Sequence, residues 1–251
     1  MMYLALGLLK VRGEEMIDKV KAPFFVFNPK SYLYGDTLLE MAVEADQLAA
    51  NYPECTFFVT CPYSDIQNIA KHTENIIVTA QHLDGISPGR GMGKVLPESI
   101  YHAGARATFL NHAEHPLSFS ELVQSINKAN ELKIMTIVCA DSIKEAKAIA
   151  TLEPDIILCE PTELIGTGQT SDKEYVLTTN QIVKDISPNT LVMQAAGISS
   201  AQDVYDVIKL GADGTGCTSG IVKAPDPKAI LKDMFEAAIK AYREGDSDDS
   251  L

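Results

Sequence analysis

Residues 134–160 read IMTIVCADSIKEAKAIATLEPDIILCE, and they hold the unit from which the whole chain is built. Two short apolar runs, 134–139 and 155–160, flank the amphipathic stretch 142–152. A continuous apolar run predicts a strand that is buried on both faces, and apolar residues at helical spacing predict a helix with one buried face. The stretch is therefore typical of a parallel sheet whose strands are joined by helices.

The same alternation runs along most of the chain. Further short runs of apolar, β-branched or aromatic residues occupy 24–28, 56–60, 75–80, 107–111 and 190–194, and DGTGC at 213–217 is the eighth strand candidate. Helical spacing marks 37–52, 118–132 and 226–245, and a short helix is expected near 97–103. Eight strand–helix repeats in about 230 residues predict a closed (β/α)₈ TIM barrel with eight parallel strands. An open, doubly wound sheet is the alternative architecture.

Charge and composition exclude several classes of partner. The chain has 251 residues, 21 Lys+Arg and 34 Asp+Glu, which gives a formal net charge of −13. Such a surface repels phosphate backbones, so no nucleic-acid partner is expected. Its apolar runs are far shorter than the roughly 20 residues that span a bilayer, so no membrane partner is expected. Five widely spaced cysteines without a C-x-x-C pair predict reduced packing residues, no metal site and a cytoplasmic location.

Residues 23–244 are expected to form a single barrel domain. Residues 1–22 are predicted to be an N-terminal extension. Arg-Gly-Glu-Glu directly before Met16 is what a ribosome-binding sequence would encode if translated, so Met16 is a candidate start and residues 1–15 a mis-assigned one. The polar and acidic residues 245–251 are predicted to be a disordered tail.

Polar residues follow the predicted strands at the points where those strands end. Lys30 follows the first strand, His112 and Glu114 follow the fourth, and Glu160 closes the sixth. In parallel α/β folds these ends lie together and carry the chemistry. A lysine can bind an anion, a histidine can polarise a carbonyl, and a glutamate can act as general base. The pattern predicts proton transfer beside a carbonyl group. Gln81, His82 and Asp84 follow the third strand without an assigned role.

Loops rich in glycine and hydroxyl groups follow the last three predicted strands. Gly166 lies in a Gly-Thr-Gly loop, Gly197 follows the seventh strand, and Thr218 and Ser219 follow the eighth. Backbone amides in such loops bind phosphate in many barrels. The expected substrate is therefore a small phosphorylated molecule.

Six segments, in order, resemble the triosephosphate isomerase family and are closest to its short archaeal-type branch. They read NPKSY (28–32), QHLDGISPGRGMGKVLPE (81–98), LNHAEH (110–115), EPTELIGTG (160–168), AAGISSAQDV (195–204) and TSGIVKAPDP (218–227). The resemblance implies a TIM barrel that interconverts dihydroxyacetone phosphate and D-glyceraldehyde 3-phosphate in glycolysis and gluconeogenesis. It also implies a homo-oligomer, dimer or tetramer, and neither a metal nor an organic cofactor.

The resemblance further implies a catalytic role for four matching residues. Glu160 would be the base that moves a proton between two carbons, and neutral His112 would polarise the carbonyl. Lys30 would stabilise the developing enediolate, while Asn28 would orient the substrate. This division of labour is the one known for the family itself.

Five more residues would contact the substrate phosphate, if the resemblance holds at each position. Ile165 and Gly166 belong to the segment that is similar to the mobile lid of the family. Gly197, Thr218 and Ser219 belong to the two segments that are similar to its phosphate-binding loops.

Three departures from the family pattern bear on the substrate. Ala113 stands where a serine is usual, Ala195 stands where a glycine is usual, and His115-Pro116 stands where an arginine is common. These changes keep the acid–base groups but reshape the pocket. One alternative is therefore an isomerase for another small sugar phosphate, such as a tetrulose phosphate. A second alternative is a noncatalytic sugar-phosphate-binding barrel. Glu114 has two open readings, a salt bridge to a loop or to another subunit, or a proton shuttle.

Overall fold

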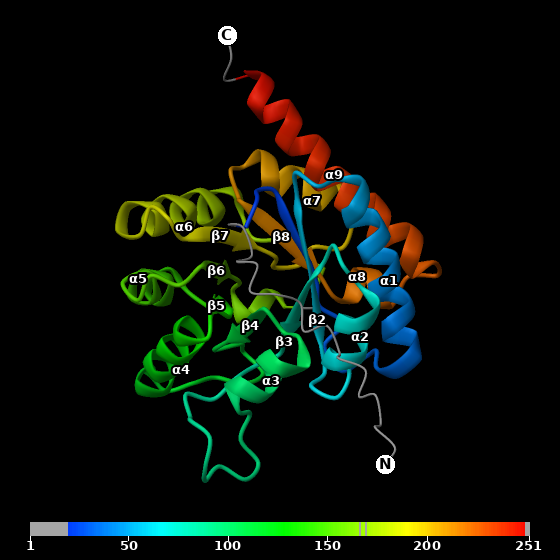
Figure 1. The fold of residues 1–251 in the computed structure, drawn as a ribbon. Coiled ribbons are helices and arrows are strands. Elements are labelled where there is room, and N and C mark those ends of the chain that lie inside the picture. The colour runs from blue at the N-terminus through cyan, green and yellow to red at the C-terminus, as the bar shows by residue number, and fades with distance from the viewer. Residues whose placement is uncertain (1–19, 166, 169, 249–251) are drawn as a thin grey trace, which may run out of the picture.

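A computed structural model describes residues 20–165, 167–168 and 170–248 of the chain, and they form a closed barrel (Figure 1). Its strands are β1 Phe24–Phe27, β2 Thr56–Cys61, β3 Ile77–Ala80, β4 Ala107–Leu110, β5 Met135–Ala140, β6 Ile156–Cys159, β7 Leu191–Gln194 and β8 Gly214–Cys217. Each strand pairs in parallel with the next, and β8 pairs with β1 to close the ring. The predicted eight-stranded barrel is confirmed, and the open sheet is wrong.

Helices surround the strands, as the alternating sequence pattern predicts (Figure 1). They are α1 Gly35–Asn51, α2 Ile66–His72, α3 Pro97–Ala103, α4 Phe119–Glu131, α5 Ile143–Ala150, α6 Lys173–Ile186, α7 Ala201–Lys209, α8 Ser219–Val222 and α9 Pro227–Asp248, and a short 3₁₀ turn spans Thr162–Leu164. Within the described ranges, none of them is long and apolar enough to cross a membrane. All five cysteines are free and buried, as expected for packing residues.

Alternate residues of each strand serve two separate cores. In β1, Phe24 and Val26 face the barrel interior, whereas Phe25 and Phe27 face the helices. Phe24 packs edge-on against Phe58 of β2, with ring centroids 5.8 Å apart. Gly214 of β8 lies so close that an added Cβ would be 2.4 Å from the Phe24 ring. The interior is therefore filled, and a ligand can bind only at an end of the barrel.

Serine caps fix the start of two helices that follow site loops. Ser118 and Ser200 each accept a hydrogen bond from the backbone of a capping-box acidic residue, which bonds back to the serine backbone. These reciprocal bonds satisfy amides that would otherwise lack partners. They end the loops after β4 and β7 at defined points.

Both ends of the predicted domain differ from expectation. Val20 packs against the interior core, and the backbone N–H of Lys21 donates to Thr56 Oγ1 at 2.8 Å, so residues 20–22 belong to the barrel rather than to an extension. Residues 1–19, which include the candidate start Met16, lie outside the described residues. Helix α9 continues through residues 245–248, which were expected to be disordered, because extending an established helix needs no new nucleus. Residues 249–251 lie outside the described residues.

Candidate active site

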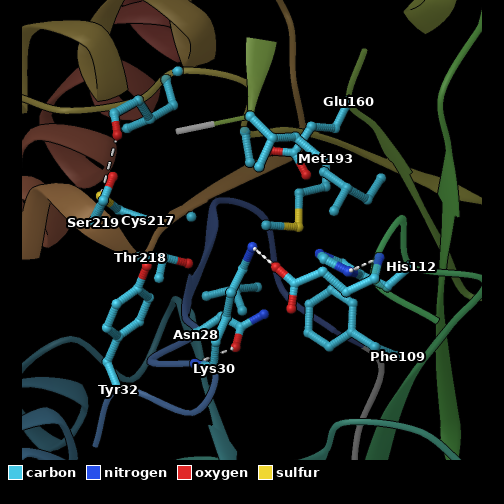
Figure 2. Close-up of a pocket in the computed structure, with 18 of the residues that line it drawn as sticks. Asn28, Lys30, Tyr32, Phe109, His112, Glu160, Met193, Cys217, Thr218 and Ser219 are labelled. Atoms are coloured by element: carbon cyan, nitrogen blue, oxygen red, sulfur yellow. Dashed lines mark hydrogen bonds and ion pairs between the residues drawn. The ribbon is translucent and has the colours of Figure 1, made fainter. Parts of the chain in front are cut away.

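A cavity of about 240 Å³ opens at the carboxyl ends of the strands (Figure 2). Eight of the nine sequence-predicted site residues line it: Asn28, Lys30, His112, Glu160, Ile165, Gly197, Thr218 and Ser219. The ninth, Gly166, lies outside the described residues. Barrel closure brings these residues together, because the ends of all eight strands meet at one face. The interior side chains Val26, Phe109 and Met193 form part of the cavity lining.

Glu160 sits directly after β6, where its backbone N–H donates to Ala140 O at 3.0 Å. Burial raises the pKa of its carboxyl above the usual range; Lys30 opposes this effect and the negative charge of Glu114 adds to it. Within the described residues, no hydrogen bond or ion pair holds the carboxylate. Ala113, where the family pattern has a serine, lines an adjoining cavity with Glu160 and offers it no hydroxyl group. Glu160 is thus a carboxylate that is poorly solvated and free to accept a proton.

His112 is held as a neutral imidazole with one defined tautomer. The backbone N–H of Glu114 donates to His112 Nδ1 at 3.1 Å, so Nδ1 is unprotonated and the ring proton is assigned to Nε2. Burial lowers the pKa of His112, and the charge of Lys30 lowers it further. Nε2–H is therefore available as a hydrogen-bond donor to a carbonyl oxygen.

Lys30 has a left-handed backbone, with φ at +50°. Its N–H donates to Asn28 Oδ1 at 3.0 Å, and its carbonyl accepts from Gln81 Nε2 at 2.8 Å. Lys30 Nζ lies 2.7 Å from Glu114 Oε1, and this hydrogen bond lowers the pKa of Glu114 (Figure 2). Of the two readings left open for Glu114, the ion pair is the one that the structure contains.

Two residues that support the site had no role in the sequence analysis. Gln81, noted only as a strand-end residue, holds the Lys30 backbone. Asn111 has φ at +55°, donates from Nδ2 to Cys139 O at 3.0 Å, and accepts from the Leu117 N–H at 3.0 Å. Asparagine tolerates the left-handed backbone region, and both residues carry a side-chain amide directly after a strand, which was the sequence signal for a supporting role. Which backbone groups the amides reach depends on the tertiary structure.

The segments after β7 and β8 lie against each other at the other side of the cavity. Cys217 Sγ donates to Ile198 O at 3.2 Å, and an added Cβ on Gly220 would be 3.0 Å from the Ser199 backbone. Gly197 has φ at +67°, a conformation that favours glycine. Backbone amides of both segments therefore share one small region, as a phosphate site requires.

The long connection between β3 and α3 projects away from the barrel (Figure 1). Asp84 braces it by accepting from the Val95 N–H at 2.6 Å and pairing with Lys94 Nζ at 3.2 Å. His82 is buried, and its ring packs at a tilt of 46° against His115, with centroids 4.2 Å apart. Neither histidine lines the cavity described above, so both remain outside the site.

No group of three or more His, Cys, Asp or Glu side chains within the described part of the chain could hold a metal ion.

Comparison with known proteins gives one family and a set of archaeal relatives. The family described as triosephosphate isomerase matches residues 23–234. The triosephosphate isomerase of Methanobacterium bryantii is 38% identical over 219 residues, 85% of this chain and 96% of that protein. The enzyme of that name from Sulfolobus acidocaldarius is 33% identical over 229 residues, 90% of this chain and 99% of its own. That of Methanocaldococcus jannaschii is 36% identical over 216 residues, with 84% and 98% covered.

Proposed function

The chain belongs to the triosephosphate isomerase family, and we propose that this aldose–ketose isomerase interconverts dihydroxyacetone phosphate and D-glyceraldehyde 3-phosphate in the cavity described above. The observation that carries the proposal is the joint lining of one cavity by Glu160, His112 and Lys30. A base, a neutral donor and a cation are what proton transfer beside a carbonyl needs. A noncatalytic barrel has no observation in its favour.

Glu160 is the proposed base. Its carboxylate removes a proton from C1 of dihydroxyacetone phosphate, the C1–H electron pair forms the C1–C2 double bond, and the carbonyl π pair moves onto O2 to give the enediolate. Once the hydroxyl proton has passed from O1 to O2, the carboxylic acid gives its proton to C2 and the O1 electron pair forms the aldehyde C=O bond at C1. Burial raises the pKa of Glu160 toward the working pH, and a better-matched base transfers protons more readily.

His112 and Lys30 are the proposed partners of the substrate oxygens. His112 Nε2–H donates to the carbonyl oxygen, and the same ring can pass the hydroxyl proton from one oxygen to the other. Lys30 supplies positive charge where the enediolate becomes negative, once it turns from Glu114 toward the substrate. Asn28 holds the Lys30 backbone and orients the substrate beside it.

The phosphate is proposed to bind at the segments after β7 and β8, through Gly197, Thr218 and Ser219. Ile165 and Gly166 belong to the segment proposed to close over it and exclude water. For Gly166 the proposal rests on the resemblance alone.

A homo-oligomer, dimer or tetramer, is proposed for the assembly. Met92, at the projecting β3–α3 connection, is fully exposed, and Tyr34 is 72% exposed. We offer these two exposed side chains as candidate interface residues, and the proposal of an oligomer itself rests on the family resemblance. We also place the protein in the cytoplasm, because five free, buried cysteines suit a reducing compartment.

One observation favours the tetrulose phosphate alternative as a second candidate. A second cavity, of about 270 Å³, shares His112, Glu160 and Ile165 with the first and is lined by Ala113 and Pro116. Two of the departures from the family pattern therefore line space beside the reacting groups. A tetrulose phosphate has one CHOH group more than dihydroxyacetone phosphate, between the carbonyl and the phosphate-bearing carbon, and the second cavity offers room for this longer chain beside the reacting groups.

The test is kcat/KM for D-glyceraldehyde 3-phosphate, with Glu160→Gln and the control Glu40→Gln, which alters an exposed carboxylate on α1. We expect a wild-type value approaching about 10⁸ M⁻¹s⁻¹ and a loss in kcat of about 10²- to 10⁴-fold in Glu160→Gln alone. Turnover that survives in Glu160→Gln would remove this residue as the base. Poor turnover of the triose with faster turnover of erythrulose 4-phosphate would establish the second candidate.

A further inference from the structure

The cavity holds four charged side chains among the described residues, two lysines and two glutamates. They are Lys30, Lys223, Glu114 and Glu160. Lys30 is already neutralised, since its Nζ lies 2.7 Å from Glu114 Oε1. Glu160 remains as an unpaired negative charge once it is ionised. Without Lys223 the cavity would therefore repel an incoming dianion.

Lys223 occupies a defined place at the edge of this cavity. It follows the last turn of α8, where its backbone N–H donates to Ser219 O at 3.2 Å. Its Nζ lies 5.9 Å from the centre of the Tyr32 ring, a cation–π distance that favours one position of a flexible side chain. No ion pair to Lys223 occurs among residues 20–165, 167–168 and 170–248.

Tyr32 lies in the loop after β1, the strand that pairs with β8, and its ring faces the Lys223 side chain. It follows the turn after β1, where its N–H donates to Pro29 O at 3.0 Å. Tyr32 lies on the same side of the cavity as Thr218 and Ser219 (Figure 2). The ring thus favours a position of the solvent-exposed Lys223 ammonium on the side of the cavity where phosphate is proposed to bind.

We propose that Lys223 is a specificity-determining residue that attracts and binds the phosphate dianion of the substrate; this rests on the proposed function and adds a residue to it. Because the chain carries a net charge of −13, the long-range field works against a dianion. A cation at the cavity edge reverses that field locally. The group recognised is a phosphate monoester dianion, and the neutral carbons of the sugar play no part in it.

The first experiment compares Lys223→Gln with Lys228→Gln, which removes the same charge from an exposed residue of α9 outside the cavity. Coulomb's law in water, for a unit charge and a dianion a few ångströms apart, predicts a roughly three- to tenfold lower kcat/KM for D-glyceraldehyde 3-phosphate in Lys223→Gln, with a smaller effect at high salt. KM should carry the change, with kcat nearly constant. Lys223→Arg should keep the wild-type value.

Unphosphorylated D-glyceraldehyde separates charge recognition from a structural role. Its slow turnover should be the same in wild type and Lys223→Gln, because it has no dianion. An equal loss with both substrates, or no loss with either, would overturn the proposal.

Inorganic phosphate provides a readout that does not depend on turnover. Its dissociation constant, measured by isothermal titration calorimetry, should rise about three- to tenfold in Lys223→Gln and stay constant in Lys228→Gln. If the wild type turned over no triose phosphate yet showed this pattern, the proposed function would fail and the phosphate role of Lys223 would stand. Equal phosphate affinity in all variants would refute that role.

Discussion

Replacing Gln81 with leucine should misplace Lys30 and leave the Lys30 side chain itself unchanged. Lys30 sits at φ +50°, where an L-residue costs about 1–2 kcal/mol. Two hydrogen bonds to its backbone offset this cost, one from Gln81 Nε2 at 2.8 Å and one to Asn28 Oδ1 at 3.0 Å. The substitution removes the first and leaves the carbonyl of Lys30 without its donor.

The size of the effect follows from these terms. A hydrogen bond of this kind contributes about 0.5–1.5 kcal/mol net, so the remaining bond no longer exceeds the strain. A loss of about 1 kcal/mol lowers the population of the active backbone conformation by about fivefold. We therefore expect kcat/KM for D-glyceraldehyde 3-phosphate to fall about five- to tenfold. The melting temperature should fall by about 2–4 °C for each kcal/mol lost.

The assay is steady-state kinetics on Gln81→Leu beside Gln181→Leu, which removes a side-chain hydrogen bond to Asp185 on the outer helix α6. The control should keep wild-type kcat/KM. Because Gln81 acts through Lys30, Gln81→Leu should cost little further activity in a Lys30→Met background. If the same factor were lost in both backgrounds, Gln81 would act elsewhere and the reasoning would be refuted.

Two further predictions concern stability. Burial raises the folded-state pKa of Glu160 above its unfolded value, so its ionisation costs stability as the pH rises through these values. Glu160→Gln should melt above the wild type at neutral pH, and the gap in melting temperature should close as the pH falls toward about 4; a gap that widens on acidification would contradict this. Gly214→Ala places a methyl group 2.4 Å from the buried Phe24 ring and should lower the free energy of unfolding by about 1–3 kcal/mol or more in denaturant titrations. In contrast, the methyl group added by Gly245→Ala on α9 meets no atom within 4 Å, so this variant should raise the free energy of unfolding by up to about 1 kcal/mol. Equal effects of the two substitutions would show that the contact with Phe24 does not cause the loss in Gly214→Ala.

Some features of this protein were determined by the sequence alone, because they depend on short-range pattern. Continuous apolar runs predicted seven of the strands and the parallel class, since burial on both faces needs such runs; β8, which reads Gly-Thr-Gly-Cys, was predicted from its place in the strand–helix alternation. Strand-end position predicted that Glu160, His112 and Lys30 would lie in one cavity, as they do, because a parallel barrel places all such ends at one face. Boundaries were less well predicted, and the end of α9 was missed because helix extension after packing leaves no local signal.

Only the tertiary structure decided how the site residues pair. Glu114 is 84 residues from Lys30, and Gln81 is 51 residues from it, yet both bond to the same lysine. Lys223 meets Tyr32 because β8 closes on β1, a contact that joins the two ends of the fold. Residue types at strand ends state which chemistry is available. Which charges pair and which backbone is strained depend on distances across the barrel, and these are set only when the sheet closes.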